Sequence, residues 1–266
     1  MTEQPPGETS DALSSNWGGG GTPEGRRIVA LLWEPAEAAG LRGPRAKLTL
    51  AEVVKAGTAE ADEQGLAALS VRRVAKRLGI AAMSVYTYVP GRSELIELMI
   101  DSVYAEFSLP DPALDWRERL TAHVEQSWLM LRRHPWLLDY NVARMPVGPH
   151  VLDVEEALYA ALATAGLRPP DVVLFTNLIG WHLRGLTRVH LADSEEERRT
   201  GVSAEAYWEA RNSFWSTYFE PVRYPTMLWL WEAGVFDDPD QSSYEAAMPR
   251  VLSAVLRLIE DRVSGY

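Results

Sequence analysis

Hydrophobic residues recur along most of this chain at the three- and four-residue spacing of amphipathic helices, and two short helical segments meet at Gly79. The first, from Val71 to Leu78, has apolar residues at positions i, i+3, i+4 and i+7, and Ser70 precedes it as a capping residue. The second, roughly Ala82 to Val89, carries small and aromatic side chains. A glycine turn between two short helices predicts a helix-turn-helix, whose second helix enters the DNA major groove.

The segments on either side of this motif follow the same helical spacing. Residues 49–52 read T-L-A-E, a capping box in which the threonine hydroxyl and the glutamate carboxylate each satisfy a free backbone amide. A helix is predicted to begin there and to end at Gly65. After a break at Pro90-Gly91-Arg92, another helix is predicted to run to about Pro110. Its inward face would consist of Leu95, Ile96, Met99 and Val103.

Helical spacing continues from Asp115 to the end of the chain. Residues 115–118 (D-W-R-E) resemble a second capping box, and His134-Pro135 breaks the helix that begins there. A charged run at 194–201 is interpreted as a solvated connection. Helices are also predicted around 136–140, from about 150 to Gly166, from Pro169 to about Asp193, and over 203–219, 227–232 and 243–263. No strand-like alternation competes, so the expected fold class is all-α.

The N-terminal segment differs from the rest in composition. Residues 1–41 are rich in Pro, Gly, Ser and Thr, and we expect a disordered or weakly ordered tail, disordered at least through Gly25, with a brief helix at Ile28–Trp33. Residues 40–45 (G-L-R-G-P-R) are interpreted as a linker, or as a basic arm along the DNA. The expected domains are the tail at 1–41, the helix-turn-helix domain at 42–92 and a larger helical domain at 93–266.

Several function classes are disfavoured by composition. The chain of 266 residues has no cysteine, which excludes disulfides, thiolate metal sites and cysteine catalysis. The first ten residues have no basic stretch followed by an apolar one, so a secretory signal is not expected. The longest apolar stretch, about Val172 to Leu191, is interrupted by Asn177, His182, Arg184 and Arg188, which is typical of a buried helix rather than a membrane span. The expected location is the cytoplasm.

Charge is divided unevenly along the chain. The net charge is −11, but Arg42 to Arg92 contains nine basic and four acidic residues, a local charge of +5 that leaves −16 for the remainder. All three lysines of the chain, Lys47, Lys55 and Lys76, lie in this block. A small basic head on an acidic body is what a DNA-binding regulator is expected to have, although a solvated helix face would also be basic.

Residues Leu69 to Met99, together with the helix before them, resemble the DNA-binding domain of the tetracycline-repressor (TetR) family. The family pattern appears here as L-S-V-R-R-V-A-K-R-L-G-I-A-A-M-S-V-Y-T-Y-V-P-G-R-S-E-L, and spacing, glycine turn and aromatic positions all agree over about 45 residues. The sequence departs from the pattern at Val89, where phenylalanine is common, and at Arg92, where lysine is usual. Arginine also binds phosphate, so the second departure changes little.

The resemblance implies which residues meet the DNA. Serine and threonine hydroxyls can bond base edges or phosphates, and a tyrosine ring or a threonine methyl can contact a thymine methyl. We expect Arg92 to hold a phosphate and Tyr86 to do the same rather than only pack, whereas Val85 and Val89 belong to the core. Met83 is either a base contact or simply exposed. The candidate DNA-binding residues are Lys47, Thr49, Ser70, Arg72, Ala82, Met83, Ser84, Tyr86, Thr87, Tyr88 and Arg92.

The resemblance also implies a homodimer through a four-helix bundle of two long helices from each copy. The helix beginning at Pro169 and the last helix are more broadly apolar than surface helices of a monomer need to be, and Gly180 and Gly185 would allow close approach. A single helix-turn-helix also makes too few base contacts for operator specificity. The candidate interface residues are Leu174, Leu178, Gly185, Val189, Met248, Val251, Leu252, Val255, Leu258 and Ile259.

Eight of the ten tryptophans lie beyond residue 115, several of them near isolated polar groups. Any single tryptophan is best explained as ordinary core, but the set predicts an apolar pocket with a few hydrogen-bonding groups, suited to a small hydrophobic or aromatic effector. The candidate ligand-binding residues are His123, Trp128, Tyr140, Asn177, Trp181 and His182. We expect no metal ion and no cofactor, because the magnesium-binding histidine and glutamate of the tetracycline-binding members cannot be aligned here.

The leading hypothesis is therefore a homodimeric repressor that leaves a palindromic double-stranded operator when the effector binds. An activator, or a regulator without an effector, fits the same residues. A helical enzyme that uses His182 with Glu155 or Asp171 as acid and base is the competing class, but no nucleophile motif, metal spacing or phosphate loop supports it.

Overall fold

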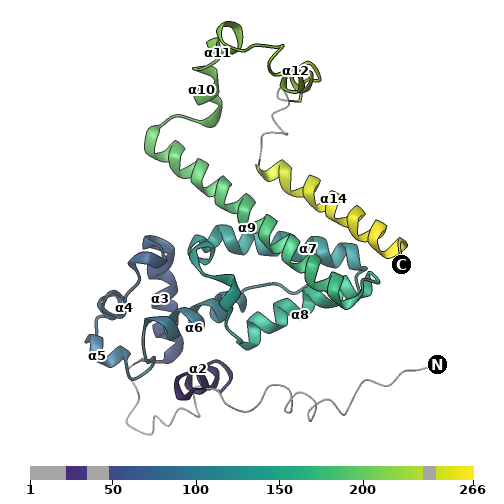
Figure 1. Cartoon of the computed structure of the whole chain (residues 1–266). Helices are drawn as coiled ribbons and strands as arrows, with labels where there is room; N and C mark the ends of the chain where they lie inside the picture. Colours follow the sequence, from purple (N-terminus) through teal and green to yellow (C-terminus); the bar gives the residue numbers. More distant parts are fainter. Residues whose placement is uncertain (1–21, 35–47, 236–243) are drawn as a thin grey trace, which may run out of the picture.

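The computed structural model describes residues 22–34, 48–235 and 244–266, and every regular element in these ranges is a helix (Figure 1). The expected all-α class, an N-terminal helix-turn-helix followed by a helical body, is confirmed. None of the helices within these ranges is long and apolar enough to cross a lipid bilayer. Predictions for the tail up to residue 21, for the segment at 40–45 and for Lys47 lie outside the described residues.

The first described helix, α2 (Pro23–Trp33), is longer than the sequence indicated. The hydroxyl of Thr22 accepts a hydrogen bond from the amide of Gly25, and Pro23 occupies the first helical position, where a missing N–H costs nothing. Residues 23–25 are thus helical, which corrects the prediction of disorder through Gly25. The helix packs on α6, and the indole of Trp33 donates a hydrogen bond to the carbonyl of Val147, 2.7 Å away.

The helices of the head are α3 (Leu50–Gln64), the 3₁₀ turn η2 (Leu66–Ala68), α4 (Val71–Leu78), α5 (Ala82–Val85) and α6 (Arg92–Tyr104). Of these, α3 and α4 begin and end at the capping residues and glycines that the sequence predicts. The predicted capping box of α3 is formed, with the Thr49 hydroxyl 3.2 Å from the Glu52 amide and the Glu52 carboxylate 2.7 Å from the Thr49 amide. Ser70 caps α4, and Gly79 ends it in the left-handed conformation at φ 68°. The four inward residues expected of α6 are all buried.

The second helix of the motif is shorter than predicted. We expected a helix to Val89, but α5 has four residues and Val85 is its last. The chain then turns through residues 86–88 with the Thr87 hydroxyl bonded to the Ser84 carbonyl, 2.6 Å away. No side chain caps the start of α5, and the β-branched Val85, Thr87 and Val89 favour helix weakly, so a long helix has little local support.

The body is built on three helices that pack against one another: α7 (Trp116–Arg133), α8 (Pro149–Thr164) and α9 (Pro169–Thr200). The capping box of α7 is present at Asp115 and Glu118. Two 3₁₀ turns, η3 (Pro135–Asp139) and η4 (Val142–Arg144), join α7 to α8. Helix α6 contacts both α3 and α8, and it therefore connects the head to the body (Figure 1).

Two predictions for the second half of the body are wrong. The charged run 194–201 is not a connection, because α9 continues to Thr200 and ends at the left-handed Gly201. Pairs Glu195–Arg198 and Glu196–Arg199, one turn apart, stabilise this extension. The helix expected over 203–219 is two short ones, α10 (Ala204–Glu209) and α11 (Ser213–Thr217). They are followed by α12 (Pro225–Glu232) and α14 (Tyr244–Ser264), near the predicted positions.

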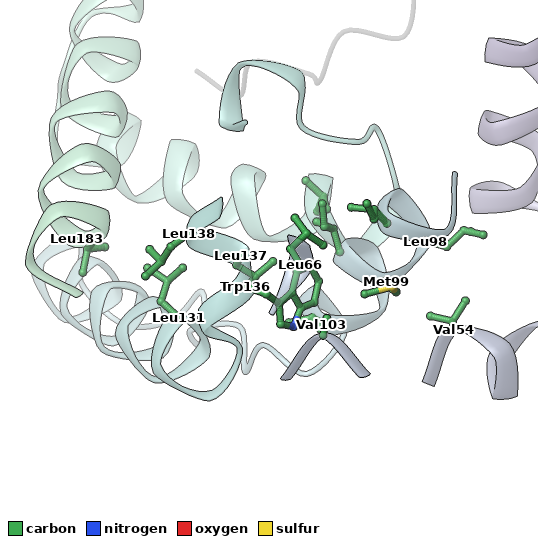
Figure 2. Close-up of a cluster of buried hydrophobic side chains, with 14 of the residues drawn as sticks. Val54, Leu66, Leu98, Met99, Val103, Leu131, Trp136, Leu137, Leu138 and Leu183 are labelled. Atoms are coloured by element: carbon green, nitrogen blue, oxygen red, sulfur yellow. The ribbon is translucent and has the colours of Figure 1, made fainter. Parts of the chain in front are cut away.

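One hydrophobic cluster runs through both head and body. Figure 2 shows Trp136 of η3 beside Leu66 of the head, Val103 of α6 and Leu137. Trp136 is 1% exposed. Because its indole lies where α3, α6 and the body meet, the angle between the two parts depends on packing at this place.

Candidate functional site

The outward face of the helix-turn-helix is formed by the residues around α5. Val85 and Val89 are fully buried, as expected, and they fix the orientation of the residues between and before them. Met83 is 75% and Tyr86 44% exposed. Ser84 and Thr87 are exposed as well, whereas Ala82 is half-buried. This face offers hydroxyls, one phenol and one thioether to a partner, a mixture suited to base edges and thymine methyls.

Two candidate DNA-binding residues are held inside the head. The Tyr88 hydroxyl donates to the carbonyl of Leu48 at 2.9 Å, so it braces α5 against the start of α3. The guanidinium of Arg92 donates to the carbonyls of Leu69 at 2.8 Å and of Leu66 at 2.6 Å. In this arrangement Arg92 secures the loop between α3 and α4, which differs from the expected phosphate contact, although its side chain reaches solvent.

Two other candidates act as helix caps. The Thr49 hydroxyl is bonded to Glu52, and the Ser70 hydroxyl accepts from the amide of Arg73. Each is therefore a structural residue whose hydroxyl already has a partner.

The basic block of the head is partly neutralised. Arg73 and Arg77 form ion pairs with Glu60, and Arg77 also pairs with Glu63, all across the α3–α4 contact. The hydrogen bond from Arg73 is the main reason why the pKa of the buried Glu60 lies below its ordinary value, against the opposing effect of burial. Arg72 is exposed and takes no part in these pairs. Fewer arginines are thus available for contact with DNA than the count of nine basic residues suggests, and on α4 it is Arg72 that remains available.

Helix α9 carries an apolar stripe on its outer face. Its large members are exposed by 39–65% and the glycines Gly180 and Gly185 lie among them, with open space where a Cβ would be. The stripe consists of Val173, Leu174, Leu178, Trp181 and Val189. Such a stripe exceeds what a monomer's surface normally exposes on one helix.

Helix α14 divides the predicted interface residues between two faces. Met248, Val255 and Ile259 are buried against the chain's own α7 and α9, so these three are corrected from dimer contacts to monomer core. Val251 and Leu252 are half-buried, and Leu258 is 51% exposed. The apolar spacing was read correctly as helical, but one face of α14 is already covered by the same chain.

The six candidate ligand-binding residues do not converge on one pocket. Asn177 and Trp181 lie on the exposed outer face of α9, where Trp181 is part of the stripe. Tyr140 donates its hydroxyl to the carbonyl of Arg144 at 2.6 Å. His123, Trp128 and His182 face the interior of the body. The prediction therefore combined two surfaces that the fold separates.

Within the body, three polar side chains on α7 and α9 have buried atoms without a hydrogen-bond partner: Nδ1 of His123, Nε2 of His182 and the hydroxyl of Thr176. Burial lowers the pKa of His123 to about 4, so its imidazole is neutral at physiological pH. It lies against Phe107, with ring centroids 5.0 Å apart and ring planes tilted by 49°. Buried polar groups that lack partners are costly, and they are available to a ligand that enters the body.

A small cavity of about 20 Å³ lies between α7, α9 and α14, with His182 in its wall. The other wall residues are aliphatic or methionine: Val124, Ile179, Leu183, Met248, Val251, Leu252 and Val255. This volume holds a single water molecule, whereas a drug-sized ligand requires at least about 300 Å³. A ligand can bind there only if α14 moves away from α7 and α9.

The head and the body are tied by two carboxylates that sequence reasoning missed. Asp62 of α3 accepts hydrogen bonds at 2.8 Å from the indole of Trp136 and from Nδ1 of His134. Asp101 of α6 is buried and binds the first turn of α8. The one local signal was the position of Asp101 on the inward, apolar side of its helix, since a buried acid needs partners.

A helix-turn-helix with an outward reading face, carried on a larger helical body, defines a DNA-binding regulator. Residues 53–99 match the model of the bacterial regulatory proteins of the tetR family, and residues 109–257 match the tetracyclin repressor-like C-terminal domain. The chain belongs to the TetR family of transcriptional repressors.

Among its relatives is the HTH-type transcriptional repressor DrrR1 of Streptomyces coeruleorubidus, which is 35% identical over 258 residues, covering 96% of this chain and 94% of DrrR1. Apo ActR of Streptomyces coelicolor has a similar structure, with a TM-score of 0.66 and 20% identity over 84% of this chain and 99% of ActR. ActR solved in complex with actinorhodin gives a TM-score of 0.65 at 22% identity, over 82% of this chain and 99% of ActR. At these identities the likeness to ActR shows the fold alone.

Proposed function

We propose that this chain is a homodimeric repressor that binds a palindromic operator through its two heads and leaves it when a hydrophobic or aromatic small molecule enters the body. The observation that carries the proposal is the exposed face of Met83, Ser84, Tyr86 and Thr87, held outward by two fully buried valines. Arg72 adds a positive charge beside this face.

The exposed stripe of α9 supports the dimer. Two copies that cover each other's stripes would bury it, and Gly180 and Gly185 would let the two helices approach closely. A dimer would present two reading faces to half-sites one helical turn apart, about 34–36 Å.

The body's interior supports the effector. His123, Thr176 and His182 supply polar atoms without partners among aliphatic and aromatic side chains, which is the composition of a small-molecule site. ActR has been solved with actinorhodin, and this compound is a suitable first probe. Because the cavity between α7, α9 and α14 is small, ligand entry would move helices and thereby change the angle of the heads.

The experiment is a selection of duplexes from a random library with the purified protein, followed by titration of the selected duplex with and without actinorhodin. We expect an inverted repeat and weaker binding when the compound is present. Selection of no sequence would contradict the DNA-binding part of the proposal. An affinity for the duplex that stays the same with and without actinorhodin, and with and without each of a panel of hydrophobic aromatic compounds, would contradict the effector part.

Replacing Arg72 and Tyr86 by alanine together is expected to weaken binding to the selected duplex by about 100-fold or more. The proposed contact of Arg72 with a base and the proposed contact of Tyr86 with a phosphate would both be lost. Both side chains are exposed, so the fold should be unchanged by circular dichroism. The matched control is Tyr218→Ala with Arg223→Ala, an exposed tyrosine and arginine of the body, which should bind the duplex like the wild type. Equal losses of affinity in the two double variants would show that the exposed face around α5 does not contact the duplex.

Replacing Trp181 by glutamate is expected to convert the dimer into a monomer, since it puts a charge in the middle of the α9 stripe. Light scattering should show half the molar mass of the wild type. Trp229→Glu on α12 is the control, because Trp229 is 64% exposed and Trp181 65%. A dimeric Trp181→Glu protein would rule out this face as the interface.

A further inference from the structure

Asp101 acts as a cap for a helix to which it does not belong. Helix α8 begins after Gly148, and no side chain of its own first turn caps it. Instead Oδ1 of Asp101 accepts hydrogen bonds from the amides of His150 at 3.0 Å and Val151 at 3.1 Å, the second and third residues of α8. These are the amides that a capping side chain normally binds, and the helix dipole adds to the attraction.

The second carboxylate oxygen of Asp101 lies 2.8 Å from Nδ1 of His150. Asp101 is buried, with 6% of the residue exposed, whereas the side chain of His150 is 48% exposed. A buried carboxylate with three contacts, all to one helix end, holds α6 to α8 in one relative position.

Gly148 is required for this contact. Its backbone has φ −81°, which any residue adopts, so its conformation does not call for glycine. A Cβ at this position would lie 2.1 Å from Oδ1 and 2.4 Å from Cγ of Asp101. Only a residue without a side chain lets the carboxylate reach the amides of α8.

Asp62 makes a second tie at a different helix of the head. Its Oδ1 binds His134 and Trp136 just after α7, and the imidazole of His134 also lies 3.5 Å from the carboxylate of Glu106. Asp62 lies on α3 and Asp101 on α6, while all their partners lie in residues 134–151, between α7 and the first turn of α8. A single hydrogen-bonded contact would let the head rotate about it. Two contacts from separate helices fix the angle between the head and the body.

We propose that Asp101 and Asp62 are positioning residues that set the angle of the head on the body and so determine which half-site spacing the dimer accepts. This inference rests on the proposed function, since spacing has meaning only for two heads on one operator. Neither residue touches the DNA. Their effect passes through α6 and α3, which pack on each other, and through the contact of α3 with α4 to the helix-turn-helix.

The test measures binding of the full-length protein to the selected duplex and to versions with one or two base pairs added between the half-sites. Two added pairs rotate one half-site by about 70° relative to the other. We expect the wild type to lose about 100-fold in affinity for this duplex, and Asp101→Ala or Asp62→Ala to lose about 10-fold or less, because a loosened head can follow the moved half-site.

Gly148→Ala is the second variant, since it displaces the carboxylate of Asp101 without removing it. It should show the same tolerance of spacing as Asp101→Ala. Combined with Asp101→Gly, which also removes the Cβ that would lie 2.9 Å away, it should change the tolerance of spacing little further.

Asp171→Ala is the matched control for a purely structural effect. Asp171 is also 6% exposed and also binds three partner atoms, on Arg262 and Tyr266, but it joins α9 to α14 within the body. We expect this variant to melt at a lower temperature and to keep the wild-type preference for spacing.

Asp101→Ala, Asp62→Ala and Gly148→Ala could each lose as much affinity for the duplex with two added base pairs as the wild type does. That result would overturn the positioning roles and leave the proposed function intact. A wild type that selects no duplex with two half-sites would overturn the proposed function and this inference with it. Equal tolerance of spacing in Asp171→Ala would also overturn the inference, because general loosening would then explain the effect.

Discussion

Replacing Trp136 by alanine should lower the free energy of unfolding by about 3–5 kcal/mol, the range measured for truncation of large buried aromatic residues. The side chain is 1% exposed and lies where the head meets the body (Figure 2). The substitution would leave a cavity between Leu66, Val103 and Leu137, and it would remove one of the two donors to Asp62. Urea denaturation followed by circular dichroism measures the loss.

Two further variants separate the contributions. Trp136→Phe keeps most of the ring and removes the N–H, so it should cost about 1–3 kcal/mol, the range for a polar group that loses its partner. Val222→Ala is the control, since Val222 is 97% exposed and its truncation should change stability by no more than about 0.5 kcal/mol. A loss below about 1 kcal/mol for Trp136→Ala would show that this junction contributes little to stability.

Acidification should destabilise the protein through His123. Burial lowers the pKa of His123 to about 4, below the value of about 6.5 in the unfolded chain, so the unfolded state binds the proton more readily. The stability from keeping this histidine neutral is fully present above about pH 6.5 and is lost as the pH falls toward 4. At pH 4.5 the loss from this group should be about 2–3 kcal/mol.

The measurement is the free energy of unfolding in urea at pH 7.5 and at pH 4.5, for the wild type and for His123→Leu. The other titrating groups are common to both proteins and cancel in the difference. We expect the wild type to lose about 2–3 kcal/mol more than the variant over this interval. Equal losses of stability in the two proteins would mean that the pKa of His123 is the same in the folded protein as in the unfolded chain.

The head was predictable because its signals are local. Thr49 with Glu52, Ser70 with the amide of Arg73, and the left-handed Gly79 each act within a few residues along the chain. Contacts between residues far apart in the sequence are not predictable in this way. Arg92 is expected at a phosphate, and in the structure it donates to carbonyls 23 and 26 residues earlier in the sequence, a contact that no local pattern encodes.

The body shows a second limit of sequence reasoning. A period of 3.6 residues identified α14 as amphipathic, but it does not say whether the apolar face meets another copy or the chain itself. Met248, Val255 and Ile259 meet the chain itself. The same limit applies to Trp181. The sequence predicts it as a pocket residue, but it lies on the exposed face of α9. The run of charges after Asp193 predicts a loop by composition, but ion pairs one turn apart, Glu195–Arg198 and Glu196–Arg199, keep it helical.

The two carboxylate ties have a consequence for the order of events during protein synthesis. Asp62 meets partners 72 and 74 residues further along the chain, and Asp101 meets amides 49 and 50 residues further along. The ribosome completes α3 to α6 well before it delivers residues 134–151, and N-terminal units generally fold first. The exposed face around α5 can therefore form on contacts within the head, and the angle of the head is set only later, when the nascent body docks onto it.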